Sequence, residues 1–174
     1  MTGVLAIGAA MALPKSSMAE AGRSADLRGS WSTRPLLPRT GATMTTLTNG
    51  WVLLVGGLVN ERAISSVVVI DPTTGRHADL TPLRNPRAYH AAAAMPDGSL
   101  IILGGMDSIP LQSVERFEFQ SNRWEYLAPL ELPRYDFCAS AAAGQILLFG
   151  GQGIDAIPAL GTYTVLTTQP EATP

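Results

Sequence analysis

A glycine pair recurs three times in this chain, each time directly after an aliphatic run. The three segments are Val52–Gly57, Ile101–Gly105 and Ile146–Gly151, and successive pairs lie 48 and 46 residues apart. A repeat period near fifty residues indicates one supersecondary unit copied along the chain, in which each copy needs its neighbours to bury its apolar faces. The spacing therefore predicts a repeat fold.

Other residues keep the same period and phase. Arginines recur at Arg39, Arg87 and Arg134, and large rings recur at Trp31, His77 and Trp124. Because regular recurrence favours a shared structural role, we expect the three arginines to hold neighbouring units together rather than to bind a ligand.

Each copy reads as short strands joined by turn signals. We expect strands a to d of the second copy over 89–95, 99–103, 113–119 and 123–127, with Pro96-Asp97-Gly98 as a tight turn. The first copy repeats this plan over 41–47, 51–55, 66–70 and 76–80, with Asn49-Gly50 as its hairpin signal. No stretch from Leu27 onward has the apolar spacing of a long helix. The pattern predicts an all-β fold.

The residue order resembles the kelch repeat, which is one four-stranded blade of a β-propeller. The resemblance is carried by the arginine, the glycine pair, Ser113–Glu118 and Asn122-Arg123-Trp124, and it spans about Trp31 to Val165. It implies kelch-type β-propeller blades, about three four-stranded antiparallel blades that form a partial propeller. In the pattern of the family, His77 stands at the usual tryptophan position, and the third copy lacks a strand d.

The repeat divides the chain into three parts. We expect a signal peptide or disordered leader over 1–26, a propeller segment over 27–166, and a tail or linker over 167–174. The propeller segment is expected to hold blades at about 39–80, 87–127 and 134–166, preceded by an isolated strand d at 28–33. Known propellers use about four to eight blades. The chain is therefore expected either to be a fragment of a longer ring or to form a homodimer that closes a six-bladed ring.

The first residues are typical of a secretory signal. Val4–Leu13 is a ten-residue apolar run, and Ala19-Glu20-Ala21 has the small-x-small form of a cleavage site, although Lys15 follows the run instead of preceding it. Ten residues are too few to span a bilayer. We expect a secreted or periplasmic protein without a membrane span, with a cytoplasmic location as the alternative.

Composition limits the partners and the kinds of site that we expect for this chain. The net charge is −2 and the twelve Lys and Arg residues are scattered, which argues against a nucleic-acid partner. The single Cys138 rules out an internal disulfide, and we expect it to be a small buried residue. His77 and His90, the only histidines, are expected to fill interfaces between blades. We therefore expect no metal, no cofactor and no catalytic residue in this chain.

Recognition is expected on one side of the blades. Tight turns join strands a to b and c to d, whereas the b-to-c loops and the d-to-a links on the other side are longer and more varied. Variable loops on a rigid scaffold commonly carry binding residues. The ligand-binding candidates are Asn60, Glu61, Arg62, Asp107, Gln112, Gln152 and Asp155.

Two classes of function remain open from the sequence. We favour a binding or scaffolding module that presents the b-to-c and d-to-a loops to a protein or carbohydrate partner. The alternative is a fragment of a kelch-propeller enzyme, either a copper oxidase like galactose oxidase or a sugar-modifying enzyme, that lacks its catalytic blades.

Overall fold

The computed structural model describes residues 36–154 and the backbone of residues 163–167. The expected leader at 1–26, the early strand at 28–33 and residues 168–174 of the expected tail lie outside the described residues. Every regular element in the described ranges is a β-strand, which confirms the predicted all-β class. Within these ranges the structure contains no helix with the length and hydrophobicity that a membrane crossing requires.

Three antiparallel sheets in up-and-down order form the blades. Blade 1 consists of β1 (Thr43–Thr46), β2 (Val52–Val55), β5 (Val67–Ile70) and β6 (His77–Asp79). Blade 2 consists of β7 (Ala91–Ala94), β8 (Leu100–Leu103), β9 (Val114–Glu118) and β10 (Arg123–Leu127). Blade 3 consists of β11 (Cys138–Ala142), β12 (Gln145–Phe149) and β13 (Tyr163–Thr167). The predicted partial propeller of kelch-type blades is confirmed.

Local turn chemistry sets the hairpins. In the turn between β1 and β2, Gly50 has φ +85° and its N–H donates to the Leu47 carbonyl at 2.9 Å. In the matching turn of blade 2, the Asp97 carboxylate accepts a hydrogen bond from the Ser99 N–H at 2.9 Å. Glycine and aspartate favour such turns because they tolerate or stabilise this backbone geometry.

One hairpin was not predicted. The segment expected as the b-to-c loop of blade 1 contains β3 (Leu58–Val59) and β4 (Arg62–Ala63), which pair with each other. The two residues between them, Asn60 and Glu61, have φ +49° and +63°. A two-residue hairpin of this kind needs positive φ at both positions, for which glutamate is an unusual choice. The residues at 60 and 61 therefore indicate this hairpin only weakly.

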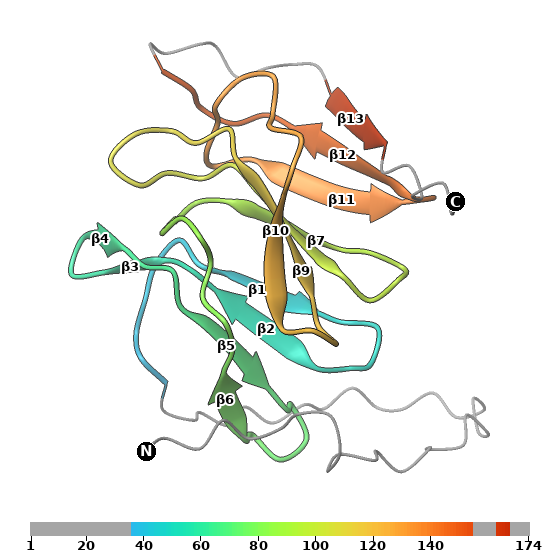
Figure 1. The fold of residues 1–174 in the computed structure, drawn as a ribbon. Helices are drawn as coiled ribbons and strands as arrows, with labels where there is room; N and C mark the ends of the chain where they lie inside the picture. Colours follow the sequence, from blue (N-terminus) through green and yellow to red (C-terminus); the bar gives the residue numbers. More distant parts are fainter. Residues whose placement is uncertain (1–35, 155–162, 168–174) are drawn as a thin grey trace, which may run out of the picture. The chain divides into compact units, whose positions relative to one another are not determined.

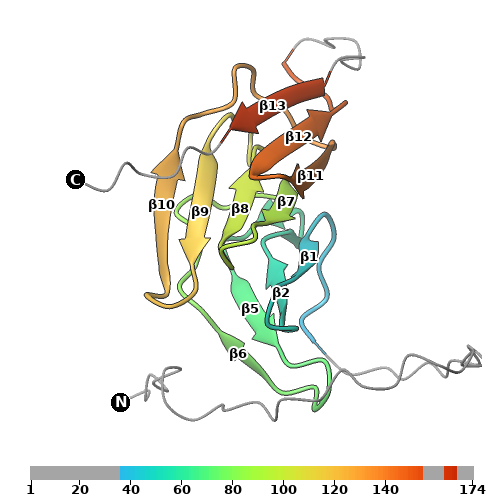
Figure 2. The ribbon, with the colours of Figure 1, turned by 90° about the vertical axis from the view of Figure 1, so that its right-hand side faces the viewer.

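The blades fan outward from their first strands. β7 contacts both β1 and β11. Figure 2 shows that the last described strands of the three blades, β6, β10 and β13, lie farther from one another than the first strands do. In Figure 1 the a-to-b turns lie at the right and the b-to-c loops at the left.

Two apolar clusters hold the blades together. The first lies between blades 1 and 2 and contains Leu47, Leu53, Val55, Val67, Val69, Leu80, Leu83, Leu100, Ile102, Phe117 and Trp124. The second lies between blades 2 and 3 and contains Ala93, Met95, Ile101, Leu103, Val114, Leu130, Ile146 and Leu148. Alternate residues of β8 thus enter different clusters, because successive side chains of a strand point to opposite faces.

Backbone hydrogen bonds repeat at both interfaces. Between blades 1 and 2, Gly57 N donates to Arg87 O at 2.9 Å, Arg87 N to Ile64 O at 3.2 Å, and Tyr89 N to Gly41 O at 2.7 Å. Between blades 2 and 3, the matching bonds run from Gly105 N to Arg134 O at 2.8 Å, from Arg134 N to Leu111 O at 3.1 Å, and from Asp136 N to Tyr89 O at 2.8 Å. The glycine pair and the arginine of each repeat therefore supply the same backbone groups to both interfaces.

Two expectations for single residues were wrong and one was confirmed. His90 is buried between blades, where its Nε2 shares a 2.8 Å hydrogen bond with the Thr43 hydroxyl. His77 is exposed instead, because β6 is an outer strand with all its residues exposed. Cys138 is also exposed, because it lies on the side of β11 that faces away from blade 2.

Candidate interaction face

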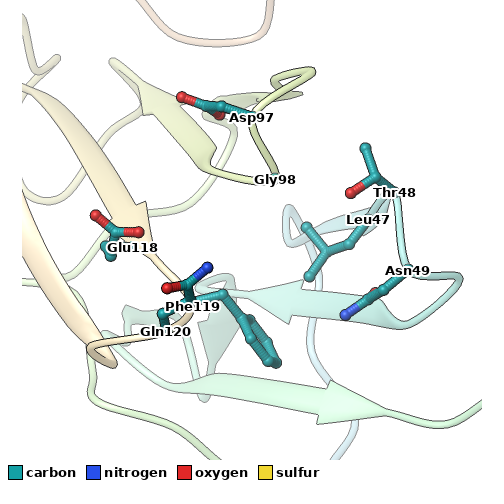
Figure 3. Close-up of a pocket in the computed structure, with 8 residues that line it drawn as sticks. All are labelled: Leu47, Thr48, Asn49, Asp97, Gly98, Glu118, Phe119 and Gln120. Atoms are coloured by element: carbon teal, nitrogen blue, oxygen red, sulfur yellow. The ribbon is translucent and has the colours of Figure 1, made fainter. Parts of the chain in front are cut away.

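The pocket between blades 1 and 2 lies on the side of the tight turns. It has a volume of about 210 Å³ and is lined by Leu47, Thr48, Asn49, Asp97, Gly98, Glu118, Phe119 and Gln120, as Figure 3 shows. Asn49 Oδ1 accepts the N–H of Trp51 at 3.0 Å. Asp97 is held by Ser99 and by Arg116, whose Nη2 lies 3.0 Å from Oδ2. These groups stabilise their own turns, so we do not place the functional site here.

The charge of Asp97 supports this structural role. Partial burial on its own would raise the pKa of Asp97, but hydrogen bonds from Ser99 and the neighbouring Arg116 outweigh it and lower the pKa below its ordinary value. Asp97 is therefore a stable anion rather than a group poised to exchange a proton.

The opposite side carries the long connections, and we call it the loop face. It comprises the described b-to-c loops at 56–66, 104–113 and 150–154 together with the links at 80–90 and 128–137. Isolated bridges anchor each loop to the start of strand a in its own copy. These bridges join Thr40 to Leu58, Ala88 to Met106 and Tyr135 to Gln152. Long loops are thus held at their bases by the scaffold.

A polar cluster marks the loop face of blade 3. Tyr135 Oη donates to Gln152 Oε1 at 3.1 Å, and Gln152 Nε2 lies 3.4 Å from Asp136 Oδ2. Asp136 has φ +56°, and the equivalent residues Tyr89 and Gly41 have φ +54° and +64°. Two non-glycine residues therefore hold a backbone conformation that favours glycine, at the point where strand a begins.

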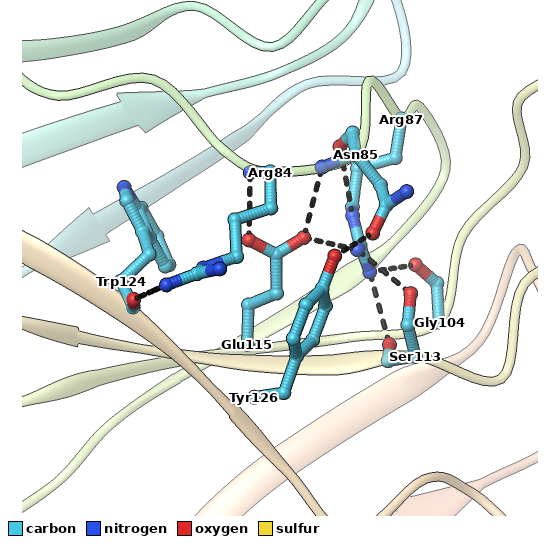
Figure 4. Close-up of polar contacts among 8 residues, drawn as sticks. All are labelled: Arg84, Asn85, Arg87, Gly104, Ser113, Glu115, Trp124 and Tyr126. Atoms are coloured by element: carbon cyan, nitrogen blue, oxygen red, sulfur yellow. Dashed lines mark hydrogen bonds and ion pairs between the residues drawn. The ribbon is translucent and has the colours of Figure 1, made fainter.

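The link from blade 1 to blade 2 is fixed by a buried ion pair. Arg87 and Glu115 are both fully buried, and Arg87 Nη2 lies 2.5 Å from Glu115 Oε1 (Figure 4). Arg87 Nη1 also donates to Gly104 O at 2.8 Å and to Ser113 O at 3.0 Å. Burial lowers the pKa of Arg87, and the Glu115 carboxylate opposes this shift. The structural role expected for the arginine is confirmed: its side chain acts within blade 2 and its backbone joins blades.

The same carboxylate positions part of the loop face. Glu115 accepts the N–H groups of Arg84 at 2.8 Å and of Asn85 at 3.2 Å. The Arg84 guanidinium donates to Trp124 O at 2.9 and 3.1 Å and lies over the Tyr126 ring, whose hydroxyl donates to Asn85 Oδ1 at 2.7 Å. Figure 4 shows these side chains gathered around Glu115. The link is therefore rigidly bound to blade 2.

The described side chains of the other copies do not form this ion pair. Arg39 donates to Gly56 O at 3.1 Å, but Val68 occupies the position that Glu115 has in blade 2. Arg134 is buried over the Phe137 ring at 5.9 Å, and its Nε and Nη1 have no hydrogen-bond partner among the described residues.

The residues predicted from the sequence lie on the loop face but do not form one cluster. Asn60, Glu61 and Arg62 are exposed at the tip of the β3–β4 hairpin. Asp107 and Gln112 are exposed in the loop between β8 and β9, where Gln112 Nε2 lies 3.5 Å from Leu130 O. Gln152 joins the polar cluster described above, and Asp155 lies outside the described residues.

Sequence reasoning missed other residues of this face. Tyr135 and Asp136 complete the cluster around Gln152. The sequence marks them only by a difference between copies: Arg134 is followed by Tyr135 and Asp136, whereas Arg87 is followed by Ala88 and Tyr89. Three aliphatic side chains on the connections are also exposed: Ile109 by 63 %, Leu132 by 39 % and Ile154 by 48 %. The sequence could have indicated them, because each is an aliphatic residue inside a predicted loop or link.

The described residues show no grouping of three or more His, Cys, Asp or Glu side chains that could hold a metal ion. The arrangement offers rigidly anchored loops with mixed apolar and polar side chains, which is the chemistry of a binding surface.

Comparisons with known proteins agree with this architecture. Residues 86–131 match the family model for the kelch motif. The chain is 31 % identical to mouse Kelch-like protein 26 over 97 residues, covering 55 % of this chain and 16 % of that protein. It is 29 % identical to mouse Kelch-like protein 35 over 131 residues, covering 73 % and 22 %. An F-box/kelch-repeat protein of Arabidopsis thaliana is 28 % identical over 92 residues, covering 50 % and 24 %.

The chain thus spans about a quarter or less of the length of these curated relatives. The matched segment contains all four strands of blade 2, and blades 1 and 3 repeat its strand order and interface bonds. The motif match and the relatives show that this chain contains a kelch motif, and the repeated blades extend the strand order of that motif to blades 1 and 3.

Proposed function

We propose that this chain is a protein-interaction scaffold whose loop face binds a protein partner. The kelch-motif match and the kelch-like relatives support an interaction role. The observation that carries the proposal is the exposure of Ile109, Leu132 and Ile154 on the connections of one face. Exposed apolar residues next to polar ones commonly mark protein-binding surfaces.

The anchoring of the loops favours this use. Because bridges and the Arg87–Glu115 pair fix the bases of the connections, little backbone freedom would be lost when a partner binds. The cluster of Tyr135, Asp136 and Gln152 offers both donors and acceptors beside the apolar residues. A partner with an apolar centre and a polar rim would fit this combination.

The test compares two variants in partner capture by cross-linking and mass spectrometry. A loop-face variant carries Ile109→Asp and Ile154→Asp, and a control carries Ser121→Asp in the exposed turn between β9 and β10 on the opposite side. We expect partners to be lost from the loop-face variant and kept by the control. Partners that bind both variants equally would contradict the proposal.

A second arm of the experiment addresses the partner class. The same proteins are applied to a glycan array, because the sequence left a carbohydrate partner open. A sugar that binds the native chain and the control but not the loop-face variant would replace the protein partner in our proposal.

A further inference from the structure

Among the described residues, no other blade covers the trailing side of blade 3, which faces away from blade 2. The residues of strand b that point to the next blade are Leu53 and Val55 in blade 1 and Ile101 and Leu103 in blade 2, and all four are at most 1 % exposed. The equivalent residues of β12 are Leu147 and Phe149, which are 37 % and 58 % exposed. Blade 3 therefore presents an apolar surface that the other two blades bury.

The first glycine of the pair on this side, Gly150, also has no described neighbour from another blade. A Cβ atom added to Gly56 or Gly104 would collide with the carbonyl of Arg87 or Arg134 in the following blade. A Cβ atom added to Gly150 would meet nothing within 4 Å. Close backbone approach thus requires glycine at the first two positions, whereas blade 3 keeps glycine with no described neighbour to require it.

Backbone groups on this side repeat the pattern of the filled interfaces. Gly57 N and Gly105 N donate to the arginine carbonyls of the next blade, and Gly41 O and Tyr89 O accept from the residue that directly follows its bridge residue. Among the described residues, the equivalent Gly151 N and Asp136 O have no backbone partner across an interface. Blade 3 therefore retains one donor and one acceptor in the register that joins blades.

The leading side of blade 1 supplies matching groups. Arg39 O corresponds to the carbonyls of Arg87 and Arg134, and Gly41 N corresponds to the N–H of Tyr89. Neither has a backbone partner across an interface in the described part of the chain. Met44 is 66 % exposed there, whereas its equivalent Ala92 packs against the first core cluster. Leu54 and Val68 are buried, so the exposed apolar contact on this side centres on Met44.

We propose that a second copy of this chain docks the leading side of its blade 1 on the trailing side of blade 3. Gly151 N would donate to Arg39 O of the second copy, and Gly41 N of that copy would donate to Asp136 O. The contact continues the two interfaces already present in the chain. The described blades of two copies joined reciprocally number six, within the range of about four to eight that closes a propeller, and such head-to-tail contacts form a ring when the rotation closes.

The experiment uses the full chain and three variants. Phe149→Glu alters the trailing side, Met44→Glu alters the leading side, and Ser121→Glu, in the exposed turn between β9 and β10, is a control on neither side. Solution mass is measured by light scattering over a range of protein concentrations, and circular dichroism checks that each variant is folded. We expect the native chain and the control to have twice the 18.4 kDa mass of one chain. Each flank variant is expected to remain monomeric.

Mixing the two flank variants gives the sharpest result. In a mixed pair, one interface combines two native sides and the other combines both altered sides. An equimolar mixture is therefore expected to recover the doubled mass that neither variant shows alone. Loss of pairing by Phe149→Glu alone, with Met44→Glu still paired, would overturn the head-to-tail contact.

Other outcomes also overturn the proposal. A folded native monomer at all concentrations would show that the trailing side takes a different occupant, such as a blade of another polypeptide. A mass that grows with concentration without a plateau would show an open chain of copies instead of a closed pair.

Discussion

A guanidinium as deeply buried as that of Arg87 is tolerated when a carboxylate and several carbonyls replace its hydration. Glu115 supplies that carboxylate, and its second oxygen binds the backbone of the link to blade 2. The pair therefore stabilises blade 2 and also holds the link to blade 2, which is part of the loop face, in place. In blade 1, where Val68 replaces the acid, Arg39 is only partly buried.

The first prediction concerns this pair. We expect Glu115→Gln to lower the free energy of unfolding by about 3–5 kcal/mol, because it leaves the buried cation of Arg87 without its counter-charge. The control is Glu125→Gln, which removes one of the two carboxylate partners of Arg116 from an exposed ion pair and is expected to cost about 0–1 kcal/mol. Urea unfolding followed by tryptophan fluorescence measures both. Equal losses would contradict the role assigned to Glu115.

His90 predicts a dependence of stability on pH. Burial and then the neighbouring charge of Arg87 lower the pKa of His90 from 6.5 to about 3. Between these values the unfolded chain binds a proton that the folded chain does not bind, so stability falls as pH falls from about 6.5 towards 3. At pH 5.5 we expect His90 to reduce the free energy of unfolding by about 1.4 kcal/mol.

Urea unfolding at pH 7.5 and pH 5.5 tests this expectation. His90→Gln should remove most of the difference between the two pH values, whereas His77→Gln should leave it in place because that side chain is exposed. If the native chain and His90→Gln respond alike to pH, then His90 is not the group responsible.

The glycine pairs end their strands in the same way but have different surroundings. Gly104 and Gly150 both have positive φ, at +54° and +77°, so alanine is strained at either position. Only at Gly104 would the added methyl group collide with the next blade, through Arg134 O and the Phe137 ring. A comparison of alanine variants at the two positions thus distinguishes the cost of backbone strain from the cost of crowding at an interface.

We expect Gly104→Ala to lower the free energy of unfolding by about 1–3 kcal/mol more than Gly150→Ala, since overpacking adds to the strain that both share. Both are measured by urea unfolding in the Phe149→Glu background, so that pairing of copies does not contribute. Equal costs would indicate that the interface shifts to accommodate the methyl group.

The strands were predictable because apolar runs, turn residues and the repeat all agree on them. The strand expected over 123–127 coincides with β10, and the other strands of blades 1 and 2 lie inside their expected ranges. The β3–β4 hairpin was missed because Glu61 is an unusual residue at positive φ. Exposure on the last blade was not predictable, since Leu147 and Phe149 are the same kinds of residue as Leu53 and Val55.

The candidate site was only partly predictable for a related reason. Its side of the blades follows from the lengths of the connections, and Gln152 was identified in this way. Its grouping with Tyr135 and Asp136 depends on the bridge between the start of strand a and the residue after the glycine pair. That bridge joins positions 17 residues apart through a backbone contact, for which side-chain identity is a weak signal.

The three blades together behave as a short array of like interfaces. Each interface has the same three backbone bonds and one apolar cluster, so stability is expected to grow with the number of filled interfaces. The exposed apolar surface of blade 3 is then an unfilled interface of the same kind. Pairing of copies should respond to the same substitutions that disturb the interfaces within the chain.

This reasoning gives a prediction for the paired molecule. Gly150→Ala is expected to weaken self-association, because at Gly56 and Gly104 an added methyl group meets the carbonyl of the following arginine, and Arg39 O of the second copy would take that place. The control is Gly144→Ala at the other end of β12, with a similar φ of +73° and no atom within 4 Å of an added Cβ. Sedimentation velocity compares the two. Both variants should suffer similar strain, but only Gly150→Ala should shift the chain towards monomer; equal pairing would mean that no arginine carbonyl approaches Gly150.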